Sequence, residues 1–225
     1  GSPNRKNSVL TYYYDWWSYN LETHELDSLA RFPGVDPNAA ISWVDVDNDI
    51  IYTAFGYIYR PSECFHQNVY AYYIKENRWE LICSDGNKKR TLAAAGNLNG
   101  RYFVGCGFNT FNLNDWWEFL PENRQWIRRA DTPSKGRIFS STAVNDNELY
   151  LIGGRYWGGT ETSMYLYKDI IVYNADVDEW YSLGNMPLGG MENTVAFFAK
   201  GKLFWGLGQI SDGSYVKSFY CTIPK

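Results

Sequence analysis

Short hydrophobic runs separated by polar turn residues make up most of this chain. The clearest set lies between residues 138 and 183, with runs at 138–144, 148–154, 169–174 and 179–183. Asn145, Asp146 and Asn147 lie between the first two runs, and such residues favour tight turns. Runs of this length predict four short β-strands. Apolar and polar residues alternate only weakly, as at Leu149–Ile152, which predicts strands buried on both faces.

One register of residues repeats along the chain. An aromatic residue is followed seven positions later by Trp or Leu in Tyr19–Leu26, Tyr72–Trp79, Phe119–Trp126 and Tyr173–Trp180. Asp or Asn stands four positions before each aromatic residue, at Asp15, Asn68, Asp115 and Asp169. Apolar runs end at Gly56, Gly107, Gly154 and Gly208, with spacings of 51, 47 and 54 residues. A repeat of about 50 residues with several short strands each is typical of a β-propeller.

These residues resemble the kelch repeat from Asp15 to Tyr220. A kelch unit has a diglycine strand, then Asp-x-x-x-Tyr, then Trp, and the closest match here is Gly153-Gly154, Asp169, Tyr173 and Trp180. Only one of the four glycine sites is a true diglycine. The resemblance implies an all-β fold, a kelch-type β-propeller of four-stranded antiparallel blades. The segments DWWSY at 15–19 and DWWEF at 115–119 are similar to a variant common in bacterial kelch proteins, which implies a bacterial exported protein.

The repeats suggest how the chain is divided. Residues 1–8 are polar and begin with Gly-Ser, so we interpret them as a remnant of an expression vector ahead of one propeller domain at 9–225. The predicted repeats lie at about 9–33, 34–84, 85–131, 132–186 and 187–225. The first has only third and fourth strands, and the last ends in a third strand at Tyr220. If Glu25–Arg31 completes the last blade there are four blades, and if the N-terminal pair forms its own there are five. The third alternative is part of a larger propeller.

Composition excludes some classes of function. The net charge of -4 argues against nucleic acid as a partner, because phosphate binding needs clustered Lys and Arg. No apolar run reaches the roughly 18 residues that span a membrane. His24 and His66 lie far apart in the register, and the four cysteines lack metal spacing, so we expect no metal and no cofactor. We predict an extracellular or periplasmic location, with the cytoplasm as the alternative.

Arginines recur at positions where a ligand could bind. Arg90 and Arg137 each stand 17 residues before the glycine of their repeat, and Arg155 follows the diglycine. The resemblance implies that such arginines face a pocket at one mouth of the channel, as in kelch proteins that bind peptides. Three guanidinium groups would suit a carboxylate, an acidic peptide or an acidic sugar. The alternative is that Arg90 and Arg137 bind backbone carbonyls and hold blades together.

The loops between second and third strands add aromatic candidates. Tyr156 and Trp157 lie in the longest loop, 155–168, while Tyr57 and Arg60 lie in the next, 57–67. Gln209 takes the position after the last glycine, as Arg155 does after the diglycine. Rings in loops can stack on sugars or anchor peptides, or they can pack on the blade beneath. The register-bound residues Trp79, Trp126, Trp180, Tyr72 and Tyr173 are instead predicted to be core.

We therefore predict a non-enzymatic binding module that binds a protein segment or a glycan, including acidic ones, at one mouth. The predicted contacts are Arg90, Arg137, Arg155, Tyr156, Trp157, Tyr57, Arg60 and Gln209. The kelch family includes a sialic-acid epimerase, but no motif here carries that reaction. The alternatives are an enzyme on an acidic sugar, with Glu63, Glu161 or Glu192 as acid or base, and a structural part of a larger assembly.

Overall fold

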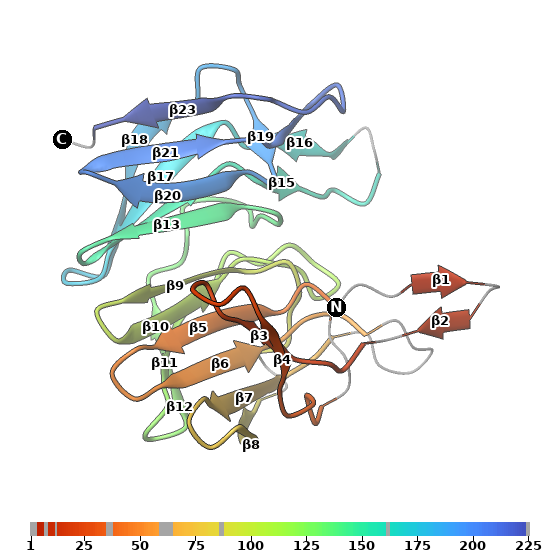
Figure 1. The fold of residues 1–225 in the computed structure, drawn as a ribbon. Helices are drawn as coiled ribbons and strands as arrows, with labels where there is room; N and C mark the ends of the chain where they lie inside the picture. Colours follow the sequence, from red (N-terminus) through yellow and green to blue (C-terminus); the bar gives the residue numbers. More distant parts are fainter. Residues whose placement is uncertain are drawn as a thin grey trace. The chain divides into compact units, whose positions relative to one another are not determined.

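The computed structural model describes residues 4–6, 9–11, 13–34, 38–58, 65–85, 88–160 and 163–223. The chain forms two compact units, residues 1–91 and 92–225, each built of antiparallel sheets (Figure 1). The strands of the first unit are β1 (Asn4–Lys6), β2 (Val9–Thr11), β3 (Trp17–Tyr19), β4 (Leu26–Ser28), β5 (Ile41–Asp45), β6 (Ile50–Ala54), β7 (Asn68–Tyr73) and β8 (Arg78–Ser84). Strands β5, β6, β7 and β8 form a four-stranded sheet in that order, and β1–β2 and β3–β4 are two-stranded.

The second unit contains two complete four-stranded sheets. Their orders are β9-β10-β11-β12 and β13-β14-β17-β18, and β20-β21-β23 form a third sheet. Two short pairs, β15–β16 and β19–β22, lie in the connections. The bounds are β9 (Ala94–Leu98), β10 (Arg101–Gly105), β11 (Trp116–Leu120), β12 (Gln125–Arg129), β13 (Ser141–Asn145), β14 (Glu148–Ile152), β15 (Arg155–Tyr156), β16 (Tyr165–Leu166), β17 (Asp169–Asn174), β18 (Glu179–Asn185), β19 (Met191–Glu192), β20 (Val195–Ala199), β21 (Lys202–Gly206), β22 (Gln209–Ile210) and β23 (Phe219–Thr222).

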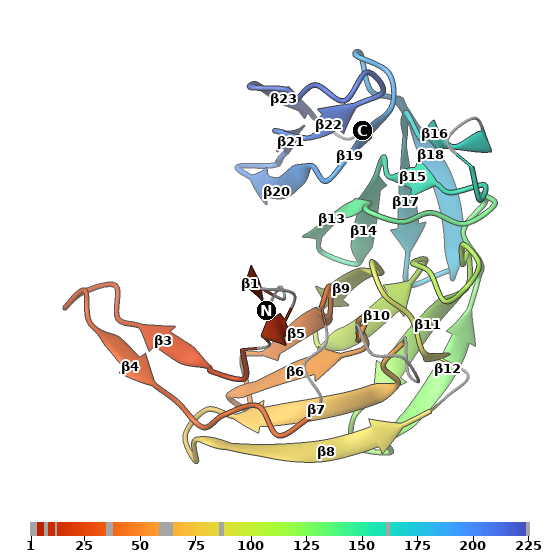
Figure 2. The same ribbon diagram turned by 90° about the vertical axis from the view of Figure 1, so that its right-hand side faces the viewer.

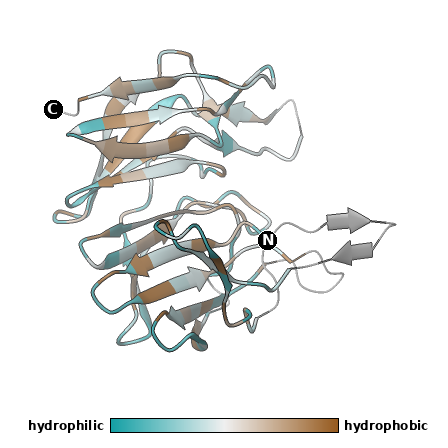
Figure 3. Ribbon diagram, viewed as in Figure 1, coloured by the Kyte–Doolittle hydropathy of each residue, from teal (hydrophilic) through white to brown (hydrophobic). Residues whose placement is uncertain are grey.

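The four strands predicted between residues 138 and 183 form β13, β14, β17 and β18, each paired with its predicted neighbours. Two cores hold the sheets of this unit together. The first is shared by β9–β12 and β13–β18 and includes Phe103, Trp116 and Tyr173; the second includes Tyr150, Met191 and Trp205. Apolar segments lie along the strands of both units (Figure 3). Because each central sheet buries residues on both faces, its strands lack strong alternation.

A repeated hydrogen-bonded arrangement, here named the alanine clasp, connects consecutive repeats. In the second unit, Trp180 Nε1 donates to the Ala130 carbonyl at 2.8 Å. The Ala130 N–H donates to Asp178 Oδ1 at 2.9 Å, and the Tyr173 hydroxyl donates to the same oxygen at 2.7 Å. The first unit repeats the clasp with Ala30, Asn77, Tyr72 and Trp79. Trp79 and Trp180 of the register therefore each bind the segment that ends the preceding repeat.

The N-terminal pair forms a sheet of its own. Leu26–Ser28 pairs with Trp17–Tyr19, which is the pairing expected if this pair forms a separate blade (Figure 2). Trp16 and Phe32 hold the pair on the β5–β8 sheet, because their ring centroids lie 5.3 and 5.1 Å from that of Trp79. In the described residues the last sheet, β20-β21-β23, has three strands.

Candidate functional site

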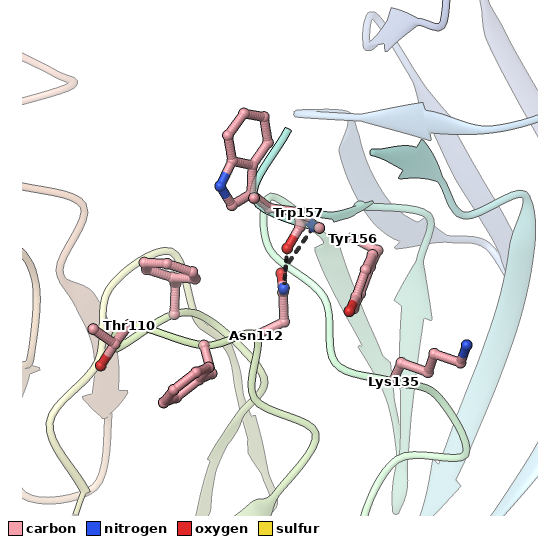
Figure 4. Close-up of a pocket in the computed structure, with 9 residues that line it drawn as sticks. Thr110, Asn112, Lys135, Tyr156 and Trp157 are labelled. Carbon is pink, nitrogen blue, oxygen red and sulfur yellow. Dashed lines mark hydrogen bonds between the residues drawn. The ribbon is translucent and has the colours of Figure 1, made fainter. Parts of the chain in front are cut away.

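Three connections of the second unit line a pocket of about 350 Å³. One loop connects β10 to β11, a second follows β14, and the connection between β12 and β13 supplies Lys135. The lining residues are Phe108, Thr110, Phe111, Asn112, Lys135, Tyr156, Trp157, Gly158 and Gly159, here named the aromatic pocket (Figure 4). Four of these nine residues carry aromatic rings, so the walls are largely flat and apolar.

Asn112 connects the two loops. Its Nδ2 donates to the Trp157 carbonyl at 2.5 Å, and its Oδ1 accepts from the Trp157 N–H at 3.0 Å. These reciprocal bonds imitate one step of a β-ladder and fix the backbone of Trp157 against the neighbouring loop (Figure 4). The aromatic ring of Trp157 is therefore positioned by a side chain from a different repeat.

A series of rings supports Tyr156 from behind. The Tyr156 ring stacks on Tyr165 with centroids 5.1 Å apart and an interplanar angle of 20°. Tyr165 contacts Tyr167 at 5.1 Å, and the Tyr167 hydroxyl donates to the Gly136 carbonyl at 3.0 Å. Burial, with the hydrogen bond to Tyr165, raises the pKa of Tyr167, so its hydroxyl is protonated at neutral pH. The pocket wall is therefore uncharged at this point.

Arg137 lies at the end of this series, with a side chain that is 0% exposed. Its guanidinium donates to both carboxylate oxygens of Asp169, at 2.9 and 3.1 Å, and to the Gly153 carbonyl at 3.1 Å. It also lies 3.8 Å from the centroid of the Tyr167 ring. The bond to the Gly153 carbonyl is of the kind that the structural alternative names, whereas the pair with the Asp169 carboxylate was not predicted, and all of these contacts lie within one repeat.

Arg90 is also buried, in the first unit. Its residue is 1% exposed, its Nε donates to the Lys88 carbonyl at 2.9 Å, and its guanidinium lies 5.8 Å from the Phe55 ring centroid. Tyr57 is half-buried in the same unit, with its ring 5.5 Å from that of Phe65. Arg60 lies outside the described residues.

Arg155 and Glu192 form a second polar site in the second unit. The Arg155 guanidinium is paired with the Glu192 carboxylate, and the Glu192 side chain is only 1% exposed. Two buried atoms of this pair, Arg155 Nε and Glu192 Oε2, have no hydrogen-bond partner among the described residues. Glu192 lies opposite Gln209 in the β19–β22 pair, so three predicted or alternative site residues meet here.

The remaining predictions concern two glutamates, metal binding and membrane spans. Glu63 and Glu161 lie outside the described residues. Within the described part of the chain, no group of three or more His, Cys, Asp or Glu side chains could hold a metal ion together. Among the same residues, no helical segment has the length and apolar character that crossing a bilayer requires.

The sequence prediction missed Phe111, Asn112 and Lys135. The prediction chose candidate binding loops by their length, which favours 155–168 over the shorter connection between β10 and β11. The available signal is the run Phe-Asn-Thr-Phe-Asn at 108–112, which combines two aromatic rings with two side-chain amides. That run identifies a polar and aromatic loop, but its contact with Trp157 depends on the fold.

Comparisons with known proteins agree on one fold. The chain is 24% identical over 169 residues to Alpha-scruin of Limulus polyphemus and 21% identical over 179 residues to Beta-scruin, both kelch-repeat proteins. A solved chain titled "Structure of YjhT", a kelch propeller, matches with a TM-score of 0.80 and 15% identity over 94% of this chain and 77% of that one. This chain has the kelch-type β-propeller fold. No family model matches the sequence.

The propeller also resembles N-acetylneuraminate epimerase of Yersinia enterocolitica, with 25% identity over 172 residues. These matches cover 60% of this chain for the epimerase and 70% and 73% for the two scruins. The chain spans less than half the length of these relatives, namely 18%, 19% and 44% of Alpha-scruin, Beta-scruin and the epimerase. A propeller of this kind supports a role as a binding or scaffold module.

Proposed function

We propose that this propeller is a glycan-binding module and that the aromatic pocket binds one sugar residue. The pocket itself is the observation that supports the proposal. Its volume of about 350 Å³ lies at the small end of the range of about 300–1,000 Å³ for ligand sites, which suits a single ring better than a folded peptide. A sugar ring has an apolar C–H face that can stack on Tyr156 or Trp157, and hydroxyls at its edge.

The polar groups of the pocket suit those hydroxyls. Lys135 is exposed and is one of the residues that line the pocket, and its positive charge favours an acidic sugar over a neutral one. Asn112 already uses its amide for Trp157, so it acts by positioning the ring. Preformed walls lower the entropy cost of binding, and the stacked rings behind Tyr156 supply such a wall.

A glycan array with the full chain tests this proposal. We expect a saccharide ligand whose affinity falls at least tenfold in Tyr156→Ala and weakens with added salt, because Lys135 contributes through an exposed charge. Lys135→Gln should remove most of the salt dependence. Tyr215→Ala is the matched control, since Tyr215 is 67% exposed on another loop of the same unit. Binding of peptides alone, or saccharide binding unchanged by Tyr156→Ala, would refute the proposal.

The Arg155–Glu192 pair favours a second candidate, an enzyme acting on an acidic sugar. A buried carboxylate with one oxygen lacking a partner can accept a proton, and the adjacent guanidinium can bind an acid group. The named relative N-acetylneuraminate epimerase supports that substrate class at 25% identity. Proton NMR of N-acetylneuraminate incubated with the protein should then show faster interconversion of its epimers, lost in Glu192→Gln. Rates equal to those without protein would exclude this candidate for that substrate.

A further inference from the structure

Tyr156 and Trp157 are consecutive residues whose rings face different parts of the aromatic pocket. Tyr156 is the last residue of β15, where it pairs with Tyr165, and Trp157 follows it directly. Successive side chains of an extended strand point to opposite sides. Figure 4 shows the result, because the Tyr156 side chain and the Trp157 ring leave the backbone in opposite directions. The pocket therefore has two separate stacking surfaces.

The Tyr156 surface is connected to the positive charge of the pocket. Of the nine described residues that line it, only Lys135 carries a charge. Tyr156 stacks on Tyr165, which contacts Tyr167. The Tyr167 hydroxyl donates to the carbonyl of Gly136, which directly follows Lys135. An acid group of a ligand is therefore best placed at the Tyr156 surface.

The Trp157 surface is uncharged and has one polar group, the indole N–H. Trp157 is half-buried, and among the described residues its Nε1 has no hydrogen-bond acceptor and its ring contacts no other aromatic ring. Trp79 and Trp180, in contrast, each donate to a backbone carbonyl. The ring of Trp157 is held through its backbone, by the two bonds to Asn112. An apolar face with a donor at its edge suits the C–H face and hydroxyls of a neutral sugar.

Phe111 extends the Trp157 surface outward. Phe111 lines the pocket and yet is 75% exposed. The loop fixes its backbone, because Phe108 and Asn112 form a β-bridge and the Asn109 N–H donates to the Phe111 carbonyl at 3.1 Å. Thr110 has a φ of 91°, which is unfavourable for a β-branched residue. Backbone strain of this kind is concentrated at active sites and ligand-binding sites. The exposed ring on this strained loop therefore indicates a contact surface.

We propose that the ligand of the aromatic pocket contains at least two joined sugar residues, an acidic one that stacks on Tyr156 and a neutral one that stacks on Trp157 and Phe111. This inference rests on the proposed glycan-binding function and adds the length and order of the ligand. The pocket volume of about 350 Å³ suits one sugar ring, so the neutral residue extends outward over the exposed Phe111. A monosaccharide would use only one of the two stacking surfaces.

Isothermal titration calorimetry of the full chain with matched saccharides tests the length of the ligand. The probes are N-acetylneuraminate and glucuronate, each as its methyl glycoside and each joined to galactose. We expect at least one acidic disaccharide to bind at least tenfold more tightly than its own monosaccharide, because the second residue adds a stacking contact. Methyl galactoside should bind at least tenfold more weakly than that disaccharide, because it lacks the acid group.

Variants of the two surfaces test the order of the ligand. Tyr156→Ala should weaken the monosaccharide and the disaccharide alike, at least tenfold. Trp157→Ala should weaken the disaccharide at least fivefold more than the monosaccharide, and Phe111→Ala should act in the same direction. Asn112→Ala keeps both rings but releases the backbone of Trp157, so it should also lower the preference for the disaccharide. Tyr215→Ala is again the control.

The failure of this inference differs from the failure of the proposed function. If no acidic saccharide binds, or if Tyr156→Ala leaves binding unchanged, the glycan-binding proposal is wrong and this inference falls with it. If Tyr156→Ala weakens binding but no disaccharide binds more tightly than its monosaccharide, the second surface is refuted and the glycan-binding proposal stands. A preference for the disaccharide that persists in both Trp157→Ala and Phe111→Ala would refute it equally.

Discussion

Replacing Trp180 by alanine tests the alanine clasp most directly. Trp180 is half-buried, and its ring lies 5.1 Å from both Trp116 and Tyr173. Trp→Ala in a core costs about 3–5 kcal/mol, and partial burial places Trp180 at the lower end. Loss of the hydrogen bond to the Ala130 carbonyl accounts for about 1 kcal/mol of this. We therefore expect the free energy of unfolding to fall by about 3 kcal/mol.

Thermal unfolding followed by near-ultraviolet circular dichroism measures the effect. A loss of about 3 kcal/mol corresponds to a fall in Tm of about 6–12 °C for a chain of this size. Trp180→Phe keeps a ring beside Trp116 but removes the indole N–H, so it should cost about 1 kcal/mol, with further loss from its smaller volume. Trp157→Ala is the control from the loop. A Tm shift in Trp180→Ala no larger than in Trp157→Ala would refute a structural role for the clasp.

Three further predictions concern buried charge and glycine. Glu118 is desolvated, which disfavours its charge, but hydrogen bonds from Arg101 and Arg129 outweigh this and lower its pKa below the usual 4.5. The contribution of the charged Glu118 to the free energy of unfolding is therefore complete above about pH 4.5 and is lost as the pH falls through the lowered pKa. Urea unfolding measured at a series of pH values should show a smaller loss of stability in acid for Glu118→Gln than for the unchanged protein. Arg137→Gln should cost about 3 kcal/mol by leaving Asp169 without its partner, and an unchanged Tm would show that the pair is not structural. Gly153→Ala should destabilise far more than Gly159→Ala, because both have positive φ but only the former places its Cβ 2.2 Å from the Met191 carbonyl oxygen; equal Tm values would contradict this.

The repeat register predicted the blades because it depends on local residues with fixed spacing. The first position of the diglycine has a left-handed backbone at all four glycine sites. Gly153 has a φ of 56°, and Phe55, Cys106 and Leu207 have φ of 62°, 56° and 60° at the matching positions. Left-handed backbone costs a non-glycine residue roughly 1–2 kcal/mol, and the surrounding sheet imposes it at three of four sites. The backbone conformation of the repeat is therefore kept at the three positions where glycine is replaced by another residue.

The candidate site was less predictable from the sequence. Arg137 stands where the repeat predicts it, but strand position does not determine whether its guanidinium faces solvent or Asp169. Asn112 gives no sign in the sequence that it will pair with Trp157, which lies 45 residues away. Contacts of this kind depend on how two loops from different repeats approach one another, and no local periodicity records that.

The alanine clasp has a consequence for how such a chain can change over time. The groups it binds on Ala130 are the amide N–H and the carbonyl, which every residue except proline offers in the same form. The joint between repeats is therefore not tied to one side chain on the preceding repeat. A copied or exchanged repeat that carries its own Tyr, Asp and Trp can join a new neighbour without matching changes there. Gene duplication and recombination could thus lengthen or reorder the chain while the joints stay intact.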